Sequence, residues 1–222
     1  MTDWNRYYQT RFKPDPRRAT LWRVICGWLQ REVPDGARVL ELGAGYCGFI
    51  NHIRAEKKVA LDIADTVRGA AAQDVETHVG SCTQLAFASD SSLDIVFASN
   101  LFEHLPLADL QRTLAEVRRV LRPGGKLLVI QPNFRYCYRD YFDDYTHVMV
   151  YTDRSLADVI AGAGLEPVRV MPRFLPFSMK SRLPAAAPLV WLYLRSPVKP
   201  FAGQMLIVAL KPVESDKHVE RQ

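Results

Sequence analysis

The chain has 222 residues, of which 48% are hydrophobic, a length and composition typical of one globular α/β domain. Its formal net charge is +5, and the basic residues are dispersed, which makes a nucleic-acid groove unlikely as the basis of its function. The four cysteines lie far apart without a C-x-x-C pair, which disfavours zinc and dithiol redox motifs and favours a reducing compartment. Residues 1–20 are polar and charged, and no apolar run approaches about 18 residues, so we expect no signal peptide, no transmembrane helix and a cytoplasmic location.

Residues 1–18 interleave aromatic and basic side chains, and prolines interrupt the end of the segment. Three interpretations remain open: a flexible arm that binds RNA, a cap over a cofactor pocket, and a helix end docked on the core. Residues 19–33 follow with apolar residues at helical spacing, which predicts a helix with one face toward the core.

Residues 39–42 form a short apolar run that leads directly into glycines, a pattern typical of a buried strand followed by a tight turn. Gly43, Gly45 and Gly48 fit the spacing G-x-G-x-x-G, which lets the backbone approach a ligand because no Cβ intervenes. By itself this spacing also occurs at ordinary strand–helix corners. We expect a helix to continue over residues 49–55.

A second predicted strand, residues 59–62, ends in Asp62, which lies 19 residues after Gly43. Rossmann-like nucleotide folds place an acid about 20 residues on, where it accepts hydrogen bonds from ribose hydroxyls. Both dinucleotides and S-adenosylmethionine are bound by this layout. Glu41 discriminates between them, because its carboxylate would repel a pyrophosphate but tolerate the ammonium group of an amino-acid moiety.

These motifs resemble those of the class I S-adenosylmethionine-dependent methyltransferases, and the likeness extends over residues 39–211. Within that class the chain is similar to a bacterial subgroup with the loop GAGYC and an SN-x-FEHL segment. The resemblance implies S-adenosylmethionine as cofactor. It also implies an α/β, Rossmann-like three-layer sandwich with a mostly parallel seven-stranded sheet and an antiparallel last strand. The implied cofactor-binding residues are Glu41, Gly43, Ala44, Gly45, Asp62, Ile63, Ser81, Cys82, Asn100 and Leu101.

Residues 81–83 depart from the family pattern, which often places an acid there to contact the adenine amino group. Adenine recognition would then use the hydroxyls of Ser81 or Thr83, or the backbone. Between Asp62 and this segment, we expect a helix at residues 64–72 and a strand at residues 75–80.

Residues 93–98 predict a central strand, and Ser99 to Leu105 follows at its carboxyl end, where open α/β sheets bind ligands. His104 is the candidate catalytic base, with Glu103 beside it to orient the ring. An equally open interpretation is a histidine at a helix start that bonds only to backbone. We expect a helix over 109–121, a helix stop and turn at Arg122-Pro123-Gly124-Gly125, and a strand over 126–130.

An aromatic run from Tyr136 to Tyr145, interleaved with aspartates, follows this strand. Its spacing is too irregular for one helix, so we expect a loop over the sheet edge, with Tyr136 and Tyr145 binding the substrate. His147, beside Asp143 and Asp144, is the second catalytic candidate. We expect no metal site, because no second histidine stands at ligand spacing.

Thr152 and Ser155 predict the start of a helix that ends near residues 162–164. Strands at 166–171 and 203–211 are expected to form an antiparallel pair, separated by a proline-rich insertion at 172–202. In that insertion, residues 189–194 are apolar with basic neighbours. They fit a helix packed on the core or in a dimer contact, and equally a shallow membrane anchor or an apolar substrate wall. Residues 213–222 are expected to be a polar tail, which leaves 1–212 as a single domain.

We therefore predict a methyltransferase of a small-molecule, glycan or lipid-like acceptor. The Asn/Asp-Pro-Pro-aromatic motif of exocyclic-amine methyltransferases is missing after the fourth strand, where Ser99 to Phe102 stands. Alternatives are an RNA methyltransferase that uses the basic arm, a non-catalytic accessory or sensor protein that binds the cofactor, and a nicotinamide oxidoreductase. Peripheral contact with the inner membrane face remains open, and the sequence indicates no oligomeric state.

Overall fold

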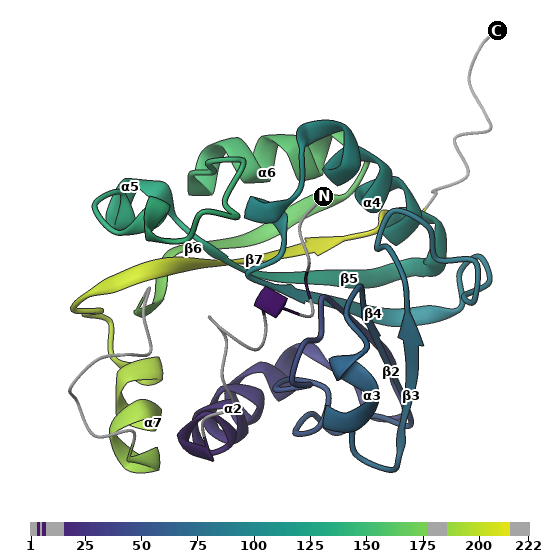
Figure 1. Ribbon diagram of the computed structural model, residues 1–222, viewed down its shortest axis with the longest axis horizontal. Coiled ribbons are helices and arrows are strands. Elements are labelled where there is room, and N and C mark those ends of the chain that lie inside the picture. The colour runs from purple at the N-terminus through teal and green to yellow at the C-terminus, as the bar shows by residue number, and fades with distance from the viewer. Residues whose placement is uncertain (1–3, 5, 8–15, 177–185, 214–222) are drawn as a thin grey trace, which may run out of the picture.

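A seven-stranded mixed sheet forms the centre of the computed structural model, which describes residues 4, 6–7, 16–176 and 186–213 (Figure 1). The strand order is β3-β2-β1-β4-β5-β7-β6, and β7 runs antiparallel to both of its neighbours. This confirms the predicted fold class. The strands are β1 (Arg38–Leu42), β2 (Lys57–Asp62), β3 (Val75–Val79), β4 (Leu93–Ser99), β5 (Leu121–Pro132), β6 (Glu166–Pro176) and β7 (Ala202–Leu210).

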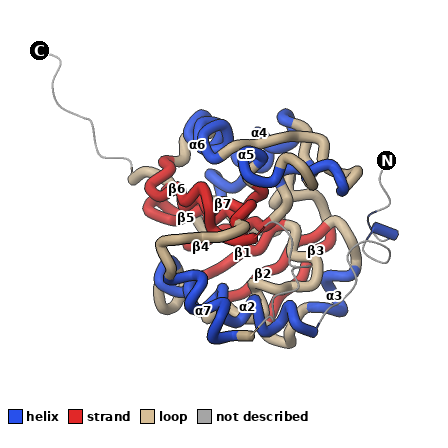
Figure 2. The backbone as a smooth tube through the Cα atoms, turned by 90° about the vertical axis from the view of Figure 1, so that its left-hand side faces the viewer, coloured by secondary structure: helices blue, strands red, loops and turns tan. Residues whose placement is uncertain are grey.

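Helices cover both faces of the sheet and make the three layers visible in Figures 1 and 2. One face carries α2 (Pro16–Leu29), which continues into η1 (Gln30–Glu32), together with α3 (Thr66–Ala70) and α7 (Ala187–Arg195). The other face carries α4 (Leu107–Val120), α5 (Phe134–Cys137) and α6 (Asp153–Gly162). Two short 3-10 segments, η2 (Phe102–His104) and η3 (Tyr141–Asp143), follow the strands β4 and β5 at the ligand-binding edge.

Successive side chains along the central strands point to opposite faces of the sheet, and they form two hydrophobic cores, one on each face. In β4, Val96 and Ala98 pack with α4 and α6, whereas Ile95 and Phe97 pack with α2 and the loop after β1. Phe97 stacks on Phe49 with ring centroids 3.8 Å apart. The fold therefore fixes the loop after β1 from below by aromatic packing.

The predicted start of α6 is confirmed, since Thr152 and Ser155 form a reciprocal capping box. The predicted helix over residues 49–55 is wrong, because the structure has consecutive turns there. The reason is local. The amide of Ile50 donates to Glu41 Oε2 at 2.9 Å instead of to a helical carbonyl, and Cys47 takes a left-handed φ of 56°.

The predicted helix stop and turn at Arg122-Pro123-Gly124-Gly125 needs a similar correction. The helix α4 does end at Val120, but the four residues lie within β5. Gly124, at a φ of 75°, donates its amide to the Lys211 carbonyl at 2.8 Å, and the Lys211 amide donates to Gly125. Pairing with the chain after β7 thus extends the strand where a turn was expected.

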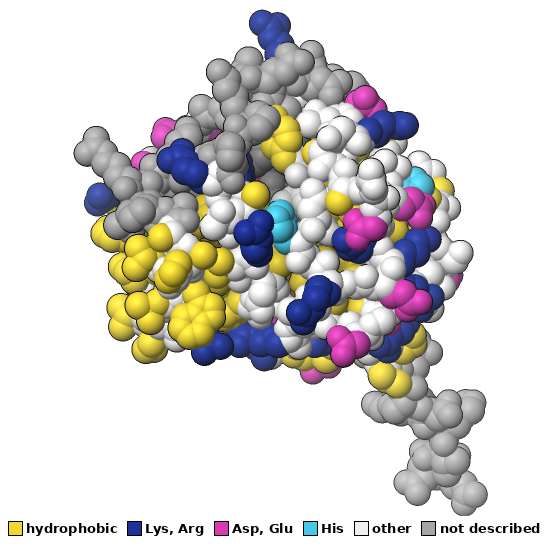
Figure 3. All heavy atoms as spheres, turned by 90° about the horizontal axis from the view of Figure 1, so that it is seen from below, with side chains coloured by type: hydrophobic (Ala, Val, Ile, Leu, Met, Phe, Trp, Pro, Cys, Tyr) yellow, Lys and Arg dark blue, Asp and Glu magenta, His cyan; other side chains and the backbone are white. Residues whose placement is uncertain are grey.

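Residues 189–194 form most of α7, which packs on α2 through the buried Leu194 and the partly buried Val190. Its outer face is apolar: Trp191 is 50% exposed and Leu192 is 60% exposed. Figure 3 shows hydrophobic side chains gathered on this side of the molecule, bordered by Lys and Arg. Within the described ranges, the structure has no helix with the length and apolar character needed to span a bilayer. Residues 177–185 of the predicted insertion, most of the N-terminal arm and all of the predicted tail but Val213 lie outside the described residues.

Candidate active site

The glycine loop after β1 is shaped by backbone conformations that favour glycine. Gly43 and Gly45 have φ angles of 63° and 52°. A Cβ at Gly43 would lie only 3.0 Å from a methyl carbon of Leu101, the second residue after β4. The Ala44 amide donates to the Leu61 carbonyl at 3.0 Å. The loop is therefore clamped between the ends of β2 and β4, with no room for larger side chains.

Asp62 closes this loop from the end of β2. Its Oδ2 accepts the Gly45 amide at 2.8 Å, and its Oδ1 accepts the Ala64 amide at 2.8 Å. A carboxylate offers about four lone pairs, so it can accept more than one donor at once. The next side chain, Ile63, is 53% exposed and gives an apolar surface beside the carboxylate.

Glu41 lies beneath the loop, in the core, with its Oε2 accepting the Ile50 amide. Burial raises the pKa of Glu41 to about 8; the charge of Asp62 acts in the same direction, and the amides of Ile50 and Phe49 oppose the shift. The Glu41 side chain therefore contacts the protein's own backbone, and it connects the loop at Ile50 to the strand β1.

Asn100 follows β4 with a φ of 49°, and its Oδ1 accepts the side-chain amide of Gln204 at 2.8 Å. This bond links the end of β4 to the start of the antiparallel strand β7. After β3, the exposed Ser81 hydroxyl lies 2.8 Å from that of Thr83. The side chain of Cys82 is buried against α4, where the Thr113 hydroxyl donates to its sulfur. The backbone of Cys82 is therefore the part that a bound molecule could contact.

The second group of predicted site residues forms a cluster that we call the histidine cluster: Glu103, His104 and His147. The first two lie on η2, and His147 comes from the loop before α6. The two imidazole centroids are 5.0 Å apart, and His147 Nε2 lies 4.0 Å from Glu103 Oε1. The histidines are 43 residues apart in the chain. Their spacing gave no sign that they meet, although each was predicted separately.

The environment of His147 fixes the position of its ring proton. Its Nδ1 lies 2.6 Å from the Tyr141 carbonyl, which only accepts, so Nδ1 carries the hydrogen and Nε2 the lone pair. Burial lowers the pKa of His147, and a charge on His104 would act in the same direction, whereas Glu103 and Asp144 raise it. A neutral imidazole therefore directs a lone pair toward Glu103.

His104 is held in the same manner and is covered by the N-terminal segment. Its Nδ1 lies 3.1 Å from the Thr146 carbonyl. The ring of Trp4 meets it edge-on at 5.7 Å, and Tyr7 donates its hydroxyl to Asp144 Oδ2 at 2.6 Å. In the described part of the arm, these aromatic residues thus lie on the histidine cluster. Of the three interpretations of residues 1–18, a contact with the body of the domain is the one that these two residues fit.

Comparison with known proteins identifies the framework. Residues 40–129 match the family model described as a methyltransferase domain. The chain is 31% identical over 159 residues to a malonyl-[acyl-carrier protein] O-methyltransferase from Methylococcus capsulatus, a match over 64% of this chain and 56% of that protein. It is 30% identical over 129 residues to a sarcosine/dimethylglycine N-methyltransferase from Halorhodospira halochloris, over 53% and 45% of the two chains. A solved Thermotoga maritima structure, described as an S-adenosylmethionine-dependent methyltransferase and possible histamine N-methyltransferase, superposes with a TM-score of 0.66 at 18% identity, over 94% of each chain.

Residues 40–129 therefore form a methyltransferase domain. The chain spans only about half the length of the curated relatives it matches, 56% and 45% for the two named above. The family assignment therefore covers the domain and its cofactor, and the acceptor must be argued from this chain's own residues.

The residues at the glycine loop fit S-adenosylmethionine as a cofactor. Gly43 and Gly45 hold the left-handed turn of the loop, Asp62 is a buried carboxylate at the end of β2, and Ile63 offers an exposed apolar surface beside it. Each of these features lies at the carboxyl ends of β1 and β2, the edge at which parallel sheets bind nucleotides.

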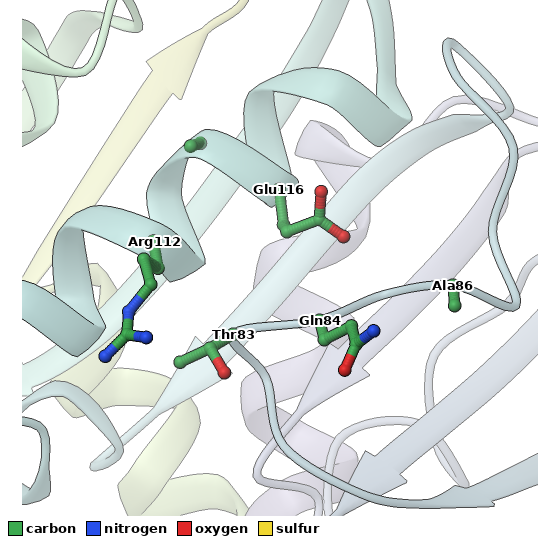
Figure 4. A pocket seen from close by; sticks show the side chains of 6 residues that line it. Thr83, Gln84, Ala86, Arg112 and Glu116 are labelled. Carbon is green, nitrogen blue, oxygen red and sulfur yellow. The ribbon is translucent and has the colours of Figure 1, made fainter.

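A shallow hollow elsewhere on the molecule lies between α4 and the segment after β3 (Figure 4). Its wall residues are engaged in structural contacts: Glu116 accepts the Leu85 amide and pairs with Arg119, and Arg112 pairs with Asp109. None of the residues that line it belongs to the glycine loop or to the histidine cluster. We therefore take the glycine loop, and not this hollow, as the candidate cofactor site. The lining residues are Thr83, Gln84, Ala86, Arg112, Ala115 and Glu116.

The two predicted substrate-binding tyrosines have different surroundings. Tyr136, on α5, stacks under the Arg173 guanidinium at 4.3 Å. Tyr145 is 74% exposed and directly precedes Thr146, whose hydroxyl lies 3.0 Å from His104 Nδ1. The aromatic rings in contact with the histidines come instead from Trp4, Tyr7 and Tyr141.

Proposed function

We propose that this chain transfers the methyl group of S-adenosylmethionine to a small-molecule, glycan or lipid-like acceptor held at the histidine cluster. The observation that carries the proposal is adjacency: Leu101 contacts Gly43 of the glycine loop, and η2, which begins at the next residue, carries Glu103 and His104. The cofactor, when bound, supplies a methyl group already activated by a positively charged sulfur. The chain's own task is to hold the acceptor in line and to exclude water, which is worth several kcal/mol of the barrier.

In this proposal Gly43, Ala44 and Gly45 surround the amino-acid end of the cofactor, and Asp62 and Ile63 receive its ribose and adenine. Glu41 acts indirectly, by holding the loop through the Ile50 amide. Asn100 and Leu101 cover the sulfonium side. At the adenine side we assign the Ser81 hydroxyl and the Cys82 backbone.

The acceptor would lie beside His104 and His147, with Tyr136 and Tyr145 at its outer end. The rings of Trp4, Tyr7 and Tyr141 around the cluster favour an acceptor that combines an apolar or stacking face with a polar group to be methylated. The relatives named for an acyl-carrier substrate and for sarcosine differ in both acceptor and methylated atom, so neither substrate is transferred to this chain.

A labelled-methyl screen tests the proposal. Extract fractions containing polar metabolites, glycans, lipids or RNA are incubated with methyl-labelled S-adenosylmethionine and wild-type protein, Asp62→Ala or His147→Ala. We expect label in one non-RNA fraction, lost with both variants, and calorimetric binding of S-adenosylhomocysteine that is lost in Asp62→Ala but retained in His147→Ala.

Other outcomes assign the rival functions. Label in RNA that disappears at high salt would identify an RNA methyltransferase. Binding of S-adenosylhomocysteine without any labelled fraction would identify an accessory or sensor protein. Binding of NAD and not of S-adenosylhomocysteine would overturn the proposal.

We propose in addition that the outer face of α7 rests on a lipid surface with anionic headgroups. Leu189, Trp191 and Leu192 are at least half exposed on this face. The described residues 186–213 contain no acidic side chain, and Arg195 lies over the Trp191 ring at 4.0 Å. An apolar face with a purely basic border is the pattern of an interfacial helix. The loop after α7 leads to β7, in which Gln204 pairs with Pro132 at the end of β5.

Sedimentation with vesicles tests this surface. We expect retention on phosphatidylglycerol vesicles, little on phosphatidylcholine vesicles, and loss of retention in Trp191→Asp. Val168→Asp, at an exposed hydrophobic position on β6, is the matched control and should bind as wild type does. Equal retention of Trp191→Asp would contradict the proposal, as would a dimer in light scattering that Trp191→Asp dissociates.

A further inference from the structure

The histidine cluster has the ligand set of a metal site. One donor atom from each of Glu103, His104 and His147 lies within 4.8 Å of the other two. A tetrahedral ion with bonds of about 2.1 Å needs its ligands about 3.5 Å apart, so side-chain movements of roughly an ångström would close the site. We propose that these three residues bind a divalent transition-metal ion. The inference deepens the proposed function, since it places the ion where that proposal places the acceptor.

The hydrogen bonds around the two imidazoles are those that metal-binding histidines make. A histidine ligand almost always donates its other ring nitrogen to a carbonyl or carboxylate, which fixes the tautomer and the ring orientation. His147 does so to the Tyr141 carbonyl at 2.6 Å, and His104 to the Thr146 carbonyl at 3.1 Å. Each ring therefore keeps its Nε2 lone pair for a cation.

Glu103 is a buried carboxylate whose charge is left without a cationic partner. It is 1% exposed, and no lysine or arginine among the described residues lies within ion-pair distance of it. Its Oε2 accepts the Gln131 side-chain amide at 2.8 Å, whereas Oε1 faces the His147 lone pair. Burying an ion in this way is costly unless a positive charge meets it.

Gln131 gives a second, independent sign. It is fully buried, and after donating Nε2 to Glu103 it leaves its Oε1 without a hydrogen-bond partner in the described part of the chain. An unpaired buried acceptor costs about 1–3 kcal/mol. A bound ion or an ordered water is a common explanation for an unsatisfied buried polar atom, and this one lies beside the cluster.

The ligand types select the ion. Two imidazole nitrogens with one carboxylate oxygen suit zinc, iron, cobalt or manganese, whereas magnesium and calcium prefer oxygen ligands throughout. Three protein ligands also leave coordination positions for water or for an oxygen of the acceptor. The four cysteines are all buried and lie outside the cluster, so thiolates do not compete for the ion at this position.

Metal titration of the full-length, chelator-treated protein tests the site. We expect calorimetry to give one Zn²⁺ per chain, and Co²⁺ to produce the visible absorption bands of a low-symmetry nitrogen and oxygen site. Zn²⁺ should also raise the melting temperature, since an ion bound only by the folded chain stabilises it. Mg²⁺ should bind at least tenfold more weakly.

Three variants locate the ion. Glu103→Gln and His147→Ala should each weaken Zn²⁺ binding at least tenfold, whereas His78→Ala, which removes a surface histidine paired with Glu76, should bind as wild type does. Binding of S-adenosylhomocysteine by both cluster variants shows that they are folded, and keeps this test separate from that of the proposed function. Absence of Zn²⁺ binding, equal affinity in Glu103→Gln and His147→Ala, or equal binding of Mg²⁺ would each overturn the site.

Discussion

The buried carboxylates of the glycine loop and of the histidine cluster have different hydrogen-bond partners. At the loop, both oxygens of Asp62 accept backbone amides, and Glu41 accepts another, so each carboxyl group is matched by donors from its own neighbourhood. At the cluster, Glu103 accepts one side-chain amide and faces a histidine lone pair. The loop carboxylates are thus held by backbone amides, whereas Glu103 has no lysine or arginine partner among the described residues.

This difference separates two kinds of site. A site whose polar atoms are satisfied by the fold contributes to stability and is already shaped for its ligand. A site whose polar atoms are unsatisfied lowers stability and gains when its ligand arrives. Substitutions at the two places should therefore change stability in opposite directions.

The largest expected effect is the pH dependence that Glu41 imposes. Its pKa in the folded protein is about 8, against an ordinary value of 4.5, so the folded state holds a proton that the unfolded state has released above about pH 4.5. The stabilisation is therefore fully present below about pH 4.5 and is lost as the pH rises to about 8, with a ceiling of about 5 kcal/mol.

Urea denaturation of wild type and Glu41→Gln between pH 5 and pH 9 measures this effect. The glutamine keeps an oxygen for the Ile50 amide but cannot ionise, so its stability should change much less over the same range. Parallel curves for the two proteins would show that Glu41 is ionised in the folded state at neutral pH.

Asp62 gives the next largest effect. Asp62→Ala removes two charge-assisted hydrogen bonds, to the amides of Gly45 and Ala64, and should lower the free energy of unfolding by about 3 kcal/mol. Asp62→Asn keeps one good acceptor and should lose about half as much. Chemical denaturation measures both, and no loss in Asp62→Ala would mean that the loop does not depend on this carboxylate.

Gly48 tests how tightly the loop is packed from below. A Cβ at this position would lie 2.3 Å from Trp22 Nε1, so Gly48→Ala must displace the indole and should cost about 1–3 kcal/mol. Gly27→Ala is the matched control, because no atom lies within 4 Å of its Cβ position in the α2 helix; it should raise stability by about 0.5–1 kcal/mol. Thermal unfolding and tryptophan fluorescence report both changes, and equal stability of the two variants would contradict the packing.

The same contrast explains what the sequence could predict. The loop is built from residues 39–62, and strand periodicity, glycine spacing and the position of Asp62 are all visible over that short stretch. The seven-stranded sheet and its antiparallel last strand followed from the family resemblance. The turns at 45–52 were missed because a side chain, Glu41, takes the Ile50 amide, and helical pattern rules consider only backbone partners.

The sequence predicted the two histidines of the cluster separately, but not that they lie next to each other. His104 and His147 each stood out, but they meet because the loop before α6 bonds back to η2, where the Glu103 carbonyl accepts the amides of Val148 and Met149. Contacts between residues so far apart depend on tertiary structure, which residue spacing does not encode. The expectation that no second histidine was available for a metal rested on spacing along the chain alone.

The smallest expected change in stability is that of Glu103→Gln. It tests most directly whether the cluster, unlike the loop, contains unsatisfied polar atoms. Glu103→Gln keeps the acceptor for the Gln131 amide and adds an amide hydrogen on the side that faces the His147 lone pair, while it removes the buried charge. In metal-free protein it should raise the free energy of unfolding by up to about 1 kcal/mol, where Asp62→Asn lowers it. Zinc should then stabilise wild type and leave Glu103→Gln unchanged. A loss of stability in Glu103→Gln comparable to that of Asp62→Asn would mean that the fold itself satisfies Glu103, and the cluster would then be a structural unit of the same kind as the loop.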